Sequence, residues 1–372
     1  MSSPTDIAEQ PLASTTTKQK PPRIVSLLPS ITEVLSALGF ADQIVGITHE
    51  CDYPPEALQS ATVVTVSDIS PHSMTQEEIH QQVTGSLLKG HSLYGLDADK
   101  LIAIQPDIIF TQSLCDVCAV SYPVVTSTCA KIFGGTDSAS SNGASPQIIS
   151  LEPNNLNDVL DTFLVAGKAL NMDPVETQQV VDKLKQNLDF IRTTVQDHLN
   201  QQSPQQQKQQ RPHVAFLEWH DPFFSGGHWI ADLMEIAGCR YTMCQSGDRS
   251  AAVTDEDFQK MDPDFILIGP CGFSVERAFE DTTRLMTIQG DNNHNDNNNK
   301  RKSWWKSLRA VQNGNVFALD GNSYYARPGP RLVQGCGLIA RCVHGEQVGT
   351  VLGEDLAPSS GMKRVTIDMY AE

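Results

Sequence analysis

Residues 101–112 read Leu-Ile-Ala-Ile-Gln-Pro-Asp-Ile-Ile-Phe-Thr-Gln, and residues 258–269 read Phe-Gln-Lys-Met-Asp-Pro-Asp-Phe-Ile-Leu-Ile-Gly. Each stretch predicts the end of a helix, a Pro-Asp turn and a run of large apolar residues. Proline stops a helix, and the apolar run is long enough for a strand that is buried on both faces. The repeat therefore predicts two similar α/β lobes. A protein with two such lobes usually holds its ligand between them.

The composition narrows the class of protein. The chain has 372 residues, of which 40% are hydrophobic, enough for two domains with their own cores. There are 27 basic and 44 acidic residues, a net charge of -17, which argues against binding to nucleic acid or to an anionic membrane surface. No stretch approaches the roughly 20 apolar residues of a membrane helix, so we expect no membrane insertion.

The N-terminal segment and the cysteines bear on the compartment. Residues 1–22 are rich in Ser, Thr, Gln and Pro and contain no apolar segment of the signal-peptide type. The nine cysteines are odd in number and scattered, which fits reduced thiols better than a disulfide framework. We therefore expect a disordered leader and a cytoplasmic protein, with an organelle as the alternative.

Hydrophobic spacing predicts one unusually long amphipathic helix over 174–200. Its apolar positions recur mostly every three or four residues: Val180, Val181, Leu184, Leu188, Ile191, Val195 and Leu199. At 1.5 Å per residue such a helix spans roughly 40 Å, long enough to run across two lobes. Strands and helices alternate on either side of it, which predicts parallel sheets.

The resulting division of the chain has six parts. They are a leader at 1–22, an N-terminal α/β lobe at 23–152, a helical connector at 153–200, a Gln-rich linker at 201–211, a C-terminal α/β lobe at 212–345 and a tail at 346–372, in which 362–369 suggests an added strand. Within the lobes we predict a strand at 124–125 and a turn-rich loop over 219–227. Ser30 or Thr32 is the expected cap of a helix over 33–39.

Ligands of open α/β sheets bind at the carboxyl ends of the strands. The loops that follow the predicted strands are 29–33, 49–55, 112–118, 219–228 and 323–331. Aromatic residues are only 6% of the chain, yet many of them gather in these loops. A flat, apolar ligand would explain this; the alternative is that some of the rings pack beneath their own lobes.

Few residues suggest catalysis or metal binding. Cys115 and Cys118 form a Cys-x-x-Cys pair after a strand, which could bind metal or do redox work, although no second such pair exists. His49 and Cys51 are further metal candidates; hydrogen bonding that fixes their Pro-rich loop is the alternative. There is no Gly-x-Ser-x-Gly elbow, P-loop or Gly-x-Gly-x-x-Gly, so we expect neither an enzyme nor a nucleotide-binding protein.

Several motifs together resemble a known family. They are Arg-Ile-Val-Ser-Leu-Leu-Pro-Ser-Ile-Thr-Glu (23–33), Thr-His-Glu-Cys-Asp-Tyr-Pro-Pro (48–55), Pro-Asp-Ile-Ile-Phe-Thr-Gln (106–112), Phe-Leu-Glu-Trp-His-Asp-Pro-Phe-Phe-Ser-Gly-Gly (216–227) and Arg-Pro-Gly-Pro-Arg-Leu-Val (327–333). They are similar to the substrate-binding proteins of cobalamin and siderophore ABC transporters, and closer to the cobalamin branch because of Asp-Tyr-Pro-Pro.

The resemblance implies two Rossmann-like lobes with parallel sheets, joined by one long helix. It also implies a corrinoid, such as cobalamin, held between the lobes by residues of both. At matching positions these are Pro29, Ser30, Thr32, Tyr53, Trp219, Phe223, Tyr325 and Arg327. The family's partner is an ABC permease, which it contacts through one surface glutamate per lobe; we find no convincing match in the first lobe.

We therefore expect a protein that binds cobalamin or a related metal chelate for storage, delivery, sensing or transport. One alternative is a ferric-siderophore or haem binder, which we rank lower because the cleft loops carry few basic residues, mainly Arg327 and Arg331. The other is a thiol-based redox or metal-dependent enzyme that uses Cys115 and Cys118.

Overall fold

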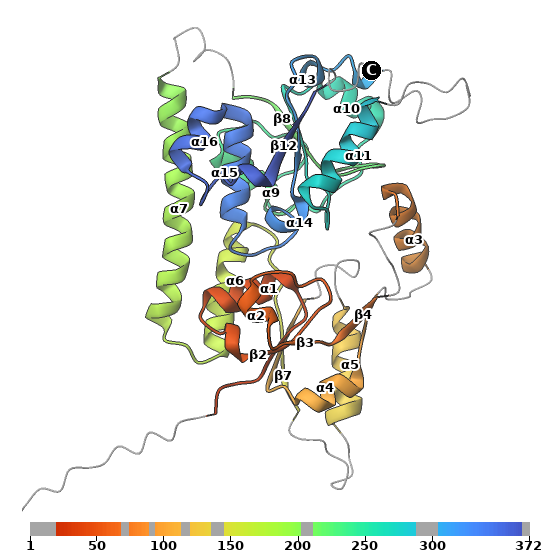
Figure 1. The fold of residues 1–372 in the computed structure, drawn as a ribbon, viewed down its shortest axis with the longest axis vertical. Coiled ribbons are helices and arrows are strands. Elements are labelled where there is room, and N and C mark those ends of the chain that lie inside the picture. Colours follow the sequence, from red (N-terminus) through yellow and green to blue (C-terminus); the bar gives the residue numbers. More distant parts are fainter. Residues whose placement is uncertain are drawn as a thin grey trace, which may run out of the picture.

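Two α/β lobes lie one above the other, and one long helix runs along both (Figure 1). The computed structural model describes residues 20–67, 74–88, 94–112, 120–134, 145–201, 211–287 and 304–366. The long helix, α7 (Pro174–Asn200), has the bounds predicted from its hydrophobic spacing. The predicted fold class, two Rossmann-like lobes joined by a backbone helix, is confirmed.

The N-terminal lobe is built on a five-stranded parallel sheet in the order β3-β2-β1-β6-β7. Its strands are β1 (Ile24–Ser26), β2 (Ile44–Ile47), β3 (Thr62–Val63), β6 (Ile108–Thr111) and β7 (Gln147–Ser150). The strands β4 (Thr65–Ser67) and β5 (Tyr94–Leu96) form a separate antiparallel ribbon. Its helices are α1 (Pro29–Ala37), α2 (Pro55–Leu58), α3 (Gln76–Leu88), α4 (Ala98–Ile104), α5 (Tyr122–Phe133) and α6 (Leu156–Ala169), with a 3-10 turn at Ala41–Gln43.

The C-terminal lobe has a five-stranded sheet in the order β12-β11-β10-β8-β9. Its strands are β8 (Val214–His220), β9 (Phe223–Ser225), β10 (Phe265–Ile268), β11 (Val316–Leu319) and β12 (Met362–Val365). Its helices are α9 (Ile230–Ile236), α10 (Asp255–Met261), α11 (Val275–Thr287), α13 (Arg309–Gln312), α14 (Gly321–Tyr324), α15 (Leu332–His344) and α16 (Glu346–Leu352), with a 3-10 turn at Ser359–Gly361.

The two Pro-Asp turns have the same structural role in their lobes. The helix before each turn ends at a residue with left-handed backbone, Gln105 (φ 42°) after α4 and Asp262 (φ 39°) after α10. The turn aspartate then accepts a hydrogen bond from the residue just before its lobe's first strand: Asp107 from the Arg23 N–H at 2.7 Å, and Asp264 from the His213 N–H at 2.9 Å. The repeated motif therefore joins a helix end to the central strands of its own sheet.

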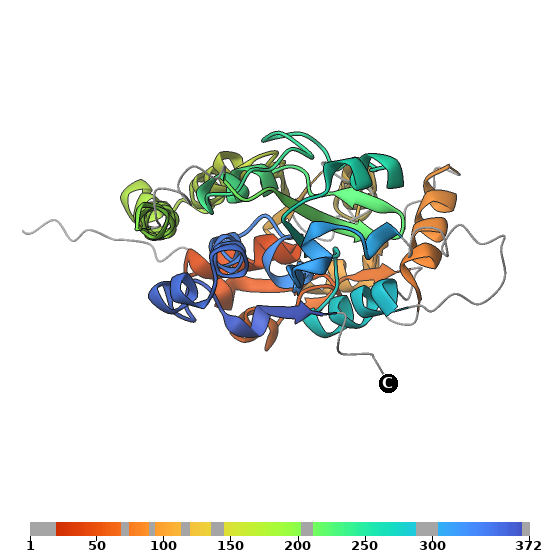
Figure 2. The same cartoon turned by 90° about the horizontal axis from the view of Figure 1, so that it is seen from above.

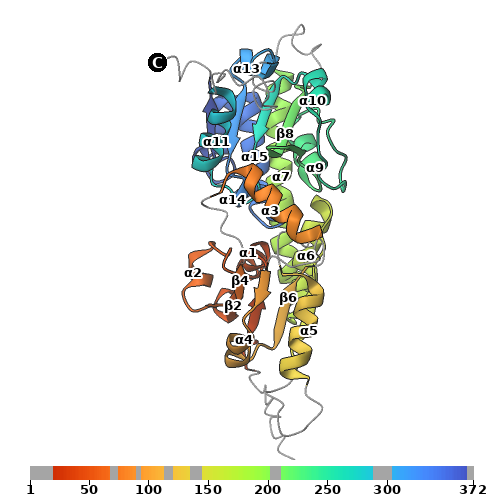
Figure 3. The ribbon, with the colours of Figure 1, turned by 90° about the vertical axis from the view of Figure 1, so that its right-hand side faces the viewer.

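Helices cover both faces of each sheet, so each lobe has two cores. Successive residues of β8 alternate between them: Phe216 packs with α7, α9 and α15, whereas Leu217 packs with Phe258 and Trp305 on the opposite face. In the N-terminal lobe, Ile24 and Val25 of β1 divide in the same way. Seen from the side, the two lobes with α7 form an elongated molecule (Figure 3).

Local predictions failed where tertiary packing decides the structure. Residues 124–125 lie inside α5, where Val125 packs into the core of the N-terminal lobe from a helix and not from a strand. The predicted loop over 219–227 contains β9, which folds back antiparallel on β8. Helix α1 begins at Pro29, and its first turn has no side-chain cap at Ser30 or Thr32; Pro suits that position because its missing N–H would have had no partner there.

Residues 346–366 belong to the C-terminal lobe. Helix α16 packs beside α15, and β12 pairs antiparallel with β11. The C-terminal sheet is therefore mixed, with antiparallel strands at both edges, and not purely parallel as predicted. Seen from above, α16 and β12 lie among the blue elements of this lobe (Figure 2).

Candidate functional site at the boundary between the lobes

Loops that follow β1, β2 and β11 meet where the two lobes touch. The contact is made by four charged side chains and one amide, which we call the ionic clamp: Glu33 and Asp52 from the N-terminal lobe, and Arg327, Arg331 and the amide of Asn322 from the C-terminal lobe. Gly329 also comes close to α1, since a Cβ built on it would lie 3.4 Å from the Ser30 carbonyl oxygen. The boundary is therefore packed and polar at this point.

Arg331 makes a two-point contact with Glu33. Its Nε lies 2.9 Å from Oε2 and its Nη2 lies 2.6 Å from Oε1. The Glu33 side chain is only 1% exposed. The Arg331 guanidinium also lies 4.4 Å from the centre of the Tyr53 ring, within the range of a cation–π contact. Residues almost 300 positions apart in the chain thus form one buried charged cluster.

Arg327 holds the second half of the clamp. Its Nη2 donates to Oδ2 of Asp52 at 3.0 Å and to Oδ1 of Asn322 at 2.9 Å, and its Nη1 donates to the other Asp52 oxygen. The Glu50 carbonyl accepts a further bond at 3.1 Å. The Asn322 amide donates to Asp52 at 2.8 Å, which closes the network. The charge of this arginine is therefore satisfied by protein groups.

The two carboxyl groups of the clamp respond differently to their surroundings. Burial raises the pKa of Glu33 above 4.5, and the hydrogen bond and charge of Arg331 offset only part of that effect. Burial also acts to raise the pKa of Asp52, but the hydrogen bond and charge of Arg327 outweigh it, so this pKa lies below 3.8. Asp52 is half exposed, whereas Glu33 is not.

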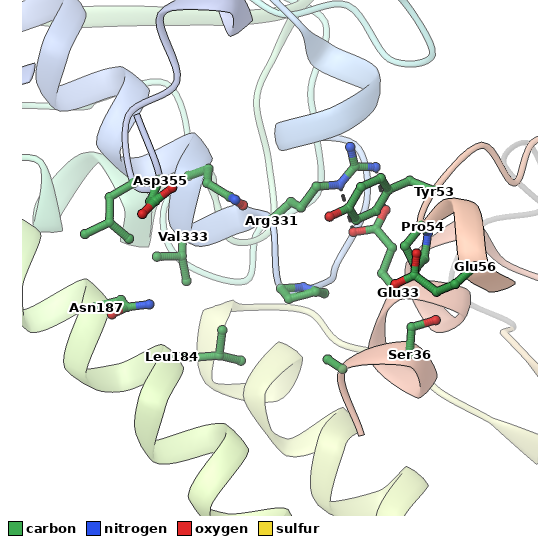
Figure 4. A pocket seen from close by; sticks show the side chains of 14 residues that line it. Glu33, Ser36, Tyr53, Pro54, Glu56, Leu184, Asn187, Arg331, Val333 and Asp355 are labelled. Carbon is green, nitrogen blue, oxygen red and sulfur yellow. Dashed lines mark hydrogen bonds and ion pairs between the residues drawn. The ribbon is translucent and has the colours of Figure 1, made fainter. Parts of the chain in front are cut away.

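A cavity of about 300 Å³ lies behind the clamp. Figure 4 shows Arg331 reaching across it to Glu33 and Tyr53, with Leu184 and Asn187 of α7 on the opposite wall. Its lining comes from α1, α7, the loop at Tyr53 and the start of α15, together with Asp355. Both lobes and the connecting helix therefore meet at this cavity.

An aromatic pair lies at the end of β8. The ring of Trp219 meets that of Phe273 edge-on, with 5.4 Å between their centroids, and its indole N–H donates to the Asp221 carbonyl at 3.1 Å. Trp219 is half-buried. Arg277 covers the Phe273 ring, with its guanidinium carbon 3.7 Å from the ring centre. Phe273 is buried, so the accessible aromatic surface here is that of Trp219, and the neighbouring Arg277 is already in contact with a ring.

The residues predicted to bind ligand lie in different surroundings. Pro29, Ser30 and Thr32 open α1 at the boundary, with Pro29 half-buried and the Thr32 hydroxyl bonded to Ser26 at 2.9 Å. Tyr53 is 43% exposed. Trp219 lies at the end of β8, as described above.

Phe223, Tyr325 and Arg327 are placed differently. Phe223 is fully buried and stacks on Phe258 and Trp305. The Tyr325 hydroxyl donates to the Gly335 carbonyl inside the core, and burial raises the pKa of this tyrosine well above its usual range. Sequence position alone does not distinguish a loop aromatic from a core aromatic, because both follow the same strand end.

Of the metal candidates, His49 and Cys51 are engaged with threonine hydroxyls. His49 Nδ1 lies 2.7 Å from the Thr65 hydroxyl, and Cys51 Sγ lies 3.2 Å from the Thr32 hydroxyl. Burial raises the pKa of the Cys51 thiol, which favours the protonated form. Cys115 and Cys118 lie outside the described residues. Among the residues that the structure describes, no three His, Cys, Asp or Glu side chains are arranged to hold a metal ion.

Sequence reasoning did not identify Glu33, Asp52, Asn322 or Phe273 as partners at the boundary. The contacts of Glu33 and Asp52 with the C-terminal lobe link positions 270 to 298 residues apart, and Phe273 contacts Trp219 from a different segment of its lobe, so no local pattern predicts these contacts. The one available signal was the pairing of acidic residues in the first motifs with two arginines in the last. Within the described part of the chain, no helix is both long and apolar enough to span a bilayer.

Solved structures with the same fold are numerous. One is a possible iron-binding periplasmic solute-binding protein of Staphylococcus epidermidis, 18% identical, with a TM-score of 0.60 over 87% of this chain and 99% of that one. Another is the periplasmic vitamin B12 binding protein BtuF of Vibrio cholerae, 20% identical, with a TM-score of 0.52 over 89% of this chain and 97% of that one. Periplasmic heme-binding proteins also share the fold.

A curated relative agrees with these structures. An uncharacterized ABC transporter substrate-binding lipoprotein, YvrC of Bacillus subtilis, is 21% identical over 333 residues, which cover 88% of this chain and 82% of the relative. The relatives are periplasmic proteins and a lipoprotein, which lie outside the cytoplasm. The prediction of a cytoplasmic location is therefore wrong: the composition of residues 1–22, on which it rested, carries less information than these comparisons.

The periplasmic binding protein family model matches residues 24–322, most of both lobes and the whole connecting helix. Its members bind substrates and do not catalyse reactions, so the expectation that the chain is not an enzyme is confirmed. Proteins of this kind bind small ligands and work with membrane permeases. The chain belongs to the periplasmic binding protein family and is a substrate-binding protein of the ABC-transporter type.

Proposed function

We propose that this protein binds cobalamin or a related corrinoid between its two lobes. The motifs shared with the cobalamin branch of the family lie on the strands and loops that meet at the boundary. One similar structure is a vitamin B12 binding protein, and others bind heme or are described as possibly iron-binding. That range leaves several metal chelates as candidates, and the charges at the boundary favour one of them.

The observation that carries the proposal is the engagement of the arginines. Arg327 and Arg331 are the main basic residues of the loops that meet here, and both are bound to carboxylates of the opposite lobe. Arg277 donates to the Met74 carbonyl and covers Phe273. An anionic ferric siderophore would need cationic partners and would have to break these pairs. A corrinoid needs mainly flat apolar surface and neutral hydrogen-bonding groups.

The residues that we propose for the ligand are those with accessible surface. Trp219 offers an aromatic face, Pro29 an apolar ring at the start of α1, and Tyr53 a half-exposed phenol. Ser30 and Thr32 would shape the turn beneath Pro29. Phe223, Tyr325 and Arg327 would act indirectly, by supporting the two lobes. An ABC permease is the partner that the family implies.

The test is a calorimetric titration of the purified protein with cyanocobalamin, dicyanocobinamide, hemin and an anionic ferric catecholate. We expect heat with the two corrinoids and none with the catecholate. No heat with either corrinoid would rule the proposal out, and heat with hemin alone would favour the haem alternative. Binding of the catecholate alone would favour the ferric-siderophore alternative.

The thiol alternative has its own test. Replacing both Cys115 and Cys118 with serine should leave the affinity for cyanocobalamin nearly unchanged, because neither is needed by a binder that uses aromatic surface. A large loss of affinity in the double variant would favour a thiol or metal role for the pair. The absorbance spectrum of protein purified from its own source provides a second check, since corrinoids, heme and ferric chelates absorb differently.

A further inference from the structure

Helix α3 belongs to the N-terminal lobe by sequence but lies against the C-terminal lobe. It falls between β4 and β5, whose antiparallel ribbon is joined to the N-terminal sheet by a bond from the Val64 N–H, just before β4, to the Ile47 carbonyl of β2 at 2.9 Å. Figures 1 and 3 show the helix away from that sheet and beside the upper lobe. The chain therefore leaves one lobe, contacts the other and returns.

Gln76 attaches the first turn of α3 to the end of β8. Its Oε1 accepts a hydrogen bond from the His220 backbone N–H at 3.1 Å, and its Nε2 lies 3.0 Å from the Nδ1 of the same histidine. Asp281 of α11 also bonds to the Gln76 side chain. Gln76 is 3% exposed and His220 is 4% exposed, so water does not replace these bonds readily.

Two weaker contacts extend the attachment. The Arg277 guanidinium donates to the Met74 carbonyl at 2.6 Å, just before the helix. One turn after Gln76, the ring of His80 lies 5.9 Å from that of Phe224 on β9. The far side of α3 carries exposed acidic residues, Glu77 and Glu78. These bonds and this ring contact all join residues 74–80 to the C-terminal lobe.

The attachment point adjoins the surface proposed for the ligand. His220 follows Trp219 directly in β8, and Arg277 joins Met74 to the Phe273 ring, which Trp219 touches. Helix α7 joins the lobes on one side of the molecule, and α3 lies on the opposite side (Figure 1). A ligand at Trp219 is thus bounded by a covalent connection on one side and by a hydrogen-bonded one on the other.

We propose that α3 is a strap, latched to the C-terminal lobe by Gln76, and that the latch opens before a ligand can enter or leave the site at Trp219. The second part rests on the proposed function. A latch that is closed with and without ligand slows association and dissociation together and leaves the equilibrium affinity unchanged. A residue that only contacts the ligand would instead change the dissociation rate and the affinity.

The variant Gln76→Ala tests the strap in the full chain, with Gln81→Ala as the matched control. Gln81 is on the same helix and is exposed, and it bonds only locally to Glu77 at 3.1 Å. Stopped-flow quenching of tryptophan fluorescence by cyanocobalamin gives both rate constants. In Gln76→Ala we expect both to rise about tenfold, with the dissociation constant within about threefold of wild type. Unchanged rates, or a rise in dissociation alone, would overturn the proposal.

Hydrogen exchange without ligand tests the latch independently. Amides of residues 76–88 should exchange faster in Gln76→Ala than in wild type or Gln81→Ala, while those of α7 stay unchanged. If no corrinoid binds wild type, the proposed function fails, and the exchange result still decides the latch. Equal exchange over 76–88 in all three proteins would contradict the strap.

Discussion

The ionic clamp and the Trp219–Phe273 pair lie at the same boundary between the lobes, yet their chemistry is opposite. At the clamp, two arginines and two carboxylates from different lobes bind one another, with Glu33 fully buried. At the aromatic pair, Trp219 is half-buried at the end of β8, and Arg277 is engaged by Phe273 and the Met74 carbonyl. The comparison suggests that ion pairs hold the two lobes together and that aromatic surface binds the ligand.

The two regions should also respond differently to mutation. A buried ion pair adds little net stability over an apolar pair, but losing one partner leaves the other charge buried and unpaired. A partly exposed aromatic ring contributes more to the affinity for a ligand than to the stability of the fold. Changes in the clamp should therefore alter folding, and changes at Trp219 should alter binding.

The largest effect is expected for Arg331→Met. This change leaves the Glu33 carboxylate buried with only Arg327 nearby, 3.6 Å away, and should lower the free energy of unfolding by about 3 kcal/mol. Urea denaturation at neutral pH measures it. The matched control is Arg192→Met on α7, where an exposed pair with Asp189 should be worth less than about 0.5 kcal/mol. An equal loss of unfolding free energy in the two variants would show that the buried clamp contributes no more than an exposed ion pair.

The next effect is expected for Trp219→Ala. Loss of its aromatic face should weaken cyanocobalamin binding about tenfold or more, because an aromatic contact is worth roughly 1 kcal/mol or more beyond its buried area. Phe190→Ala, which removes an exposed ring from α7, is the control and should leave the affinity unchanged. Calorimetric titration gives both values. An affinity for Trp219→Ala equal to wild type would remove Trp219 from the site.

The smallest effect concerns pH. The folded pKa of Asp52 lies below 3.8, so its contribution to stability is complete above that pH and is lost as the pH falls through the folded pKa. Asp52→Asn should lack this loss, a difference of less than about 1 kcal/mol because the group is half exposed. Urea denaturation from pH 5 to pH 3 checks it. If the free energy of unfolding falls equally steeply with pH for both proteins below pH 4, this role of Asp52 is contradicted.

Glu33 affects the pH dependence of stability in the opposite direction and in a different pH range. Its folded pKa is above 4.5, so it lowers stability as the pH rises from 4.5 through the folded pKa. Because Asn at position 52 does not remove Arg331 or the burial of Glu33, wild type and Asp52→Asn should both retain this trend above pH 4.5. The two carboxyl groups can thus be separated by the pH at which each acts.

Local sequence patterns predicted most of the fold. The spacing of apolar residues located α7, and the Pro-Asp motifs located β6 and β10, because these features depend on short-range geometry. The strand proposed at Val124 and Val125 is part of a helix, since two β-branched residues fit a buried helix face as well as a strand. The role of β12 depends on pairing with β11, about 45 residues earlier, which no local pattern specifies.

The site was less predictable than the fold. The loops were identified because they follow strand ends, but the direction of each side chain depends on packing. Phe223 and Phe224 are neighbours in β9, and only the first is fully buried. Arg327 lies at the boundary between the lobes, but its partner Asp52 is 275 residues away in the sequence. Such pairings are tertiary, so a single sequence does not reveal them.

The central claim is that charges at the boundary serve the lobes and not the ligand. Titration of the wild-type protein with cyanocobalamin at about 50 mM and about 500 mM sodium chloride tests it most directly, because salt screens charge–charge attraction at accessible sites. The account predicts binding with the same dissociation constant within about twofold at both concentrations. Absence of binding, or an affinity that falls about tenfold or more at the higher concentration, would contradict it.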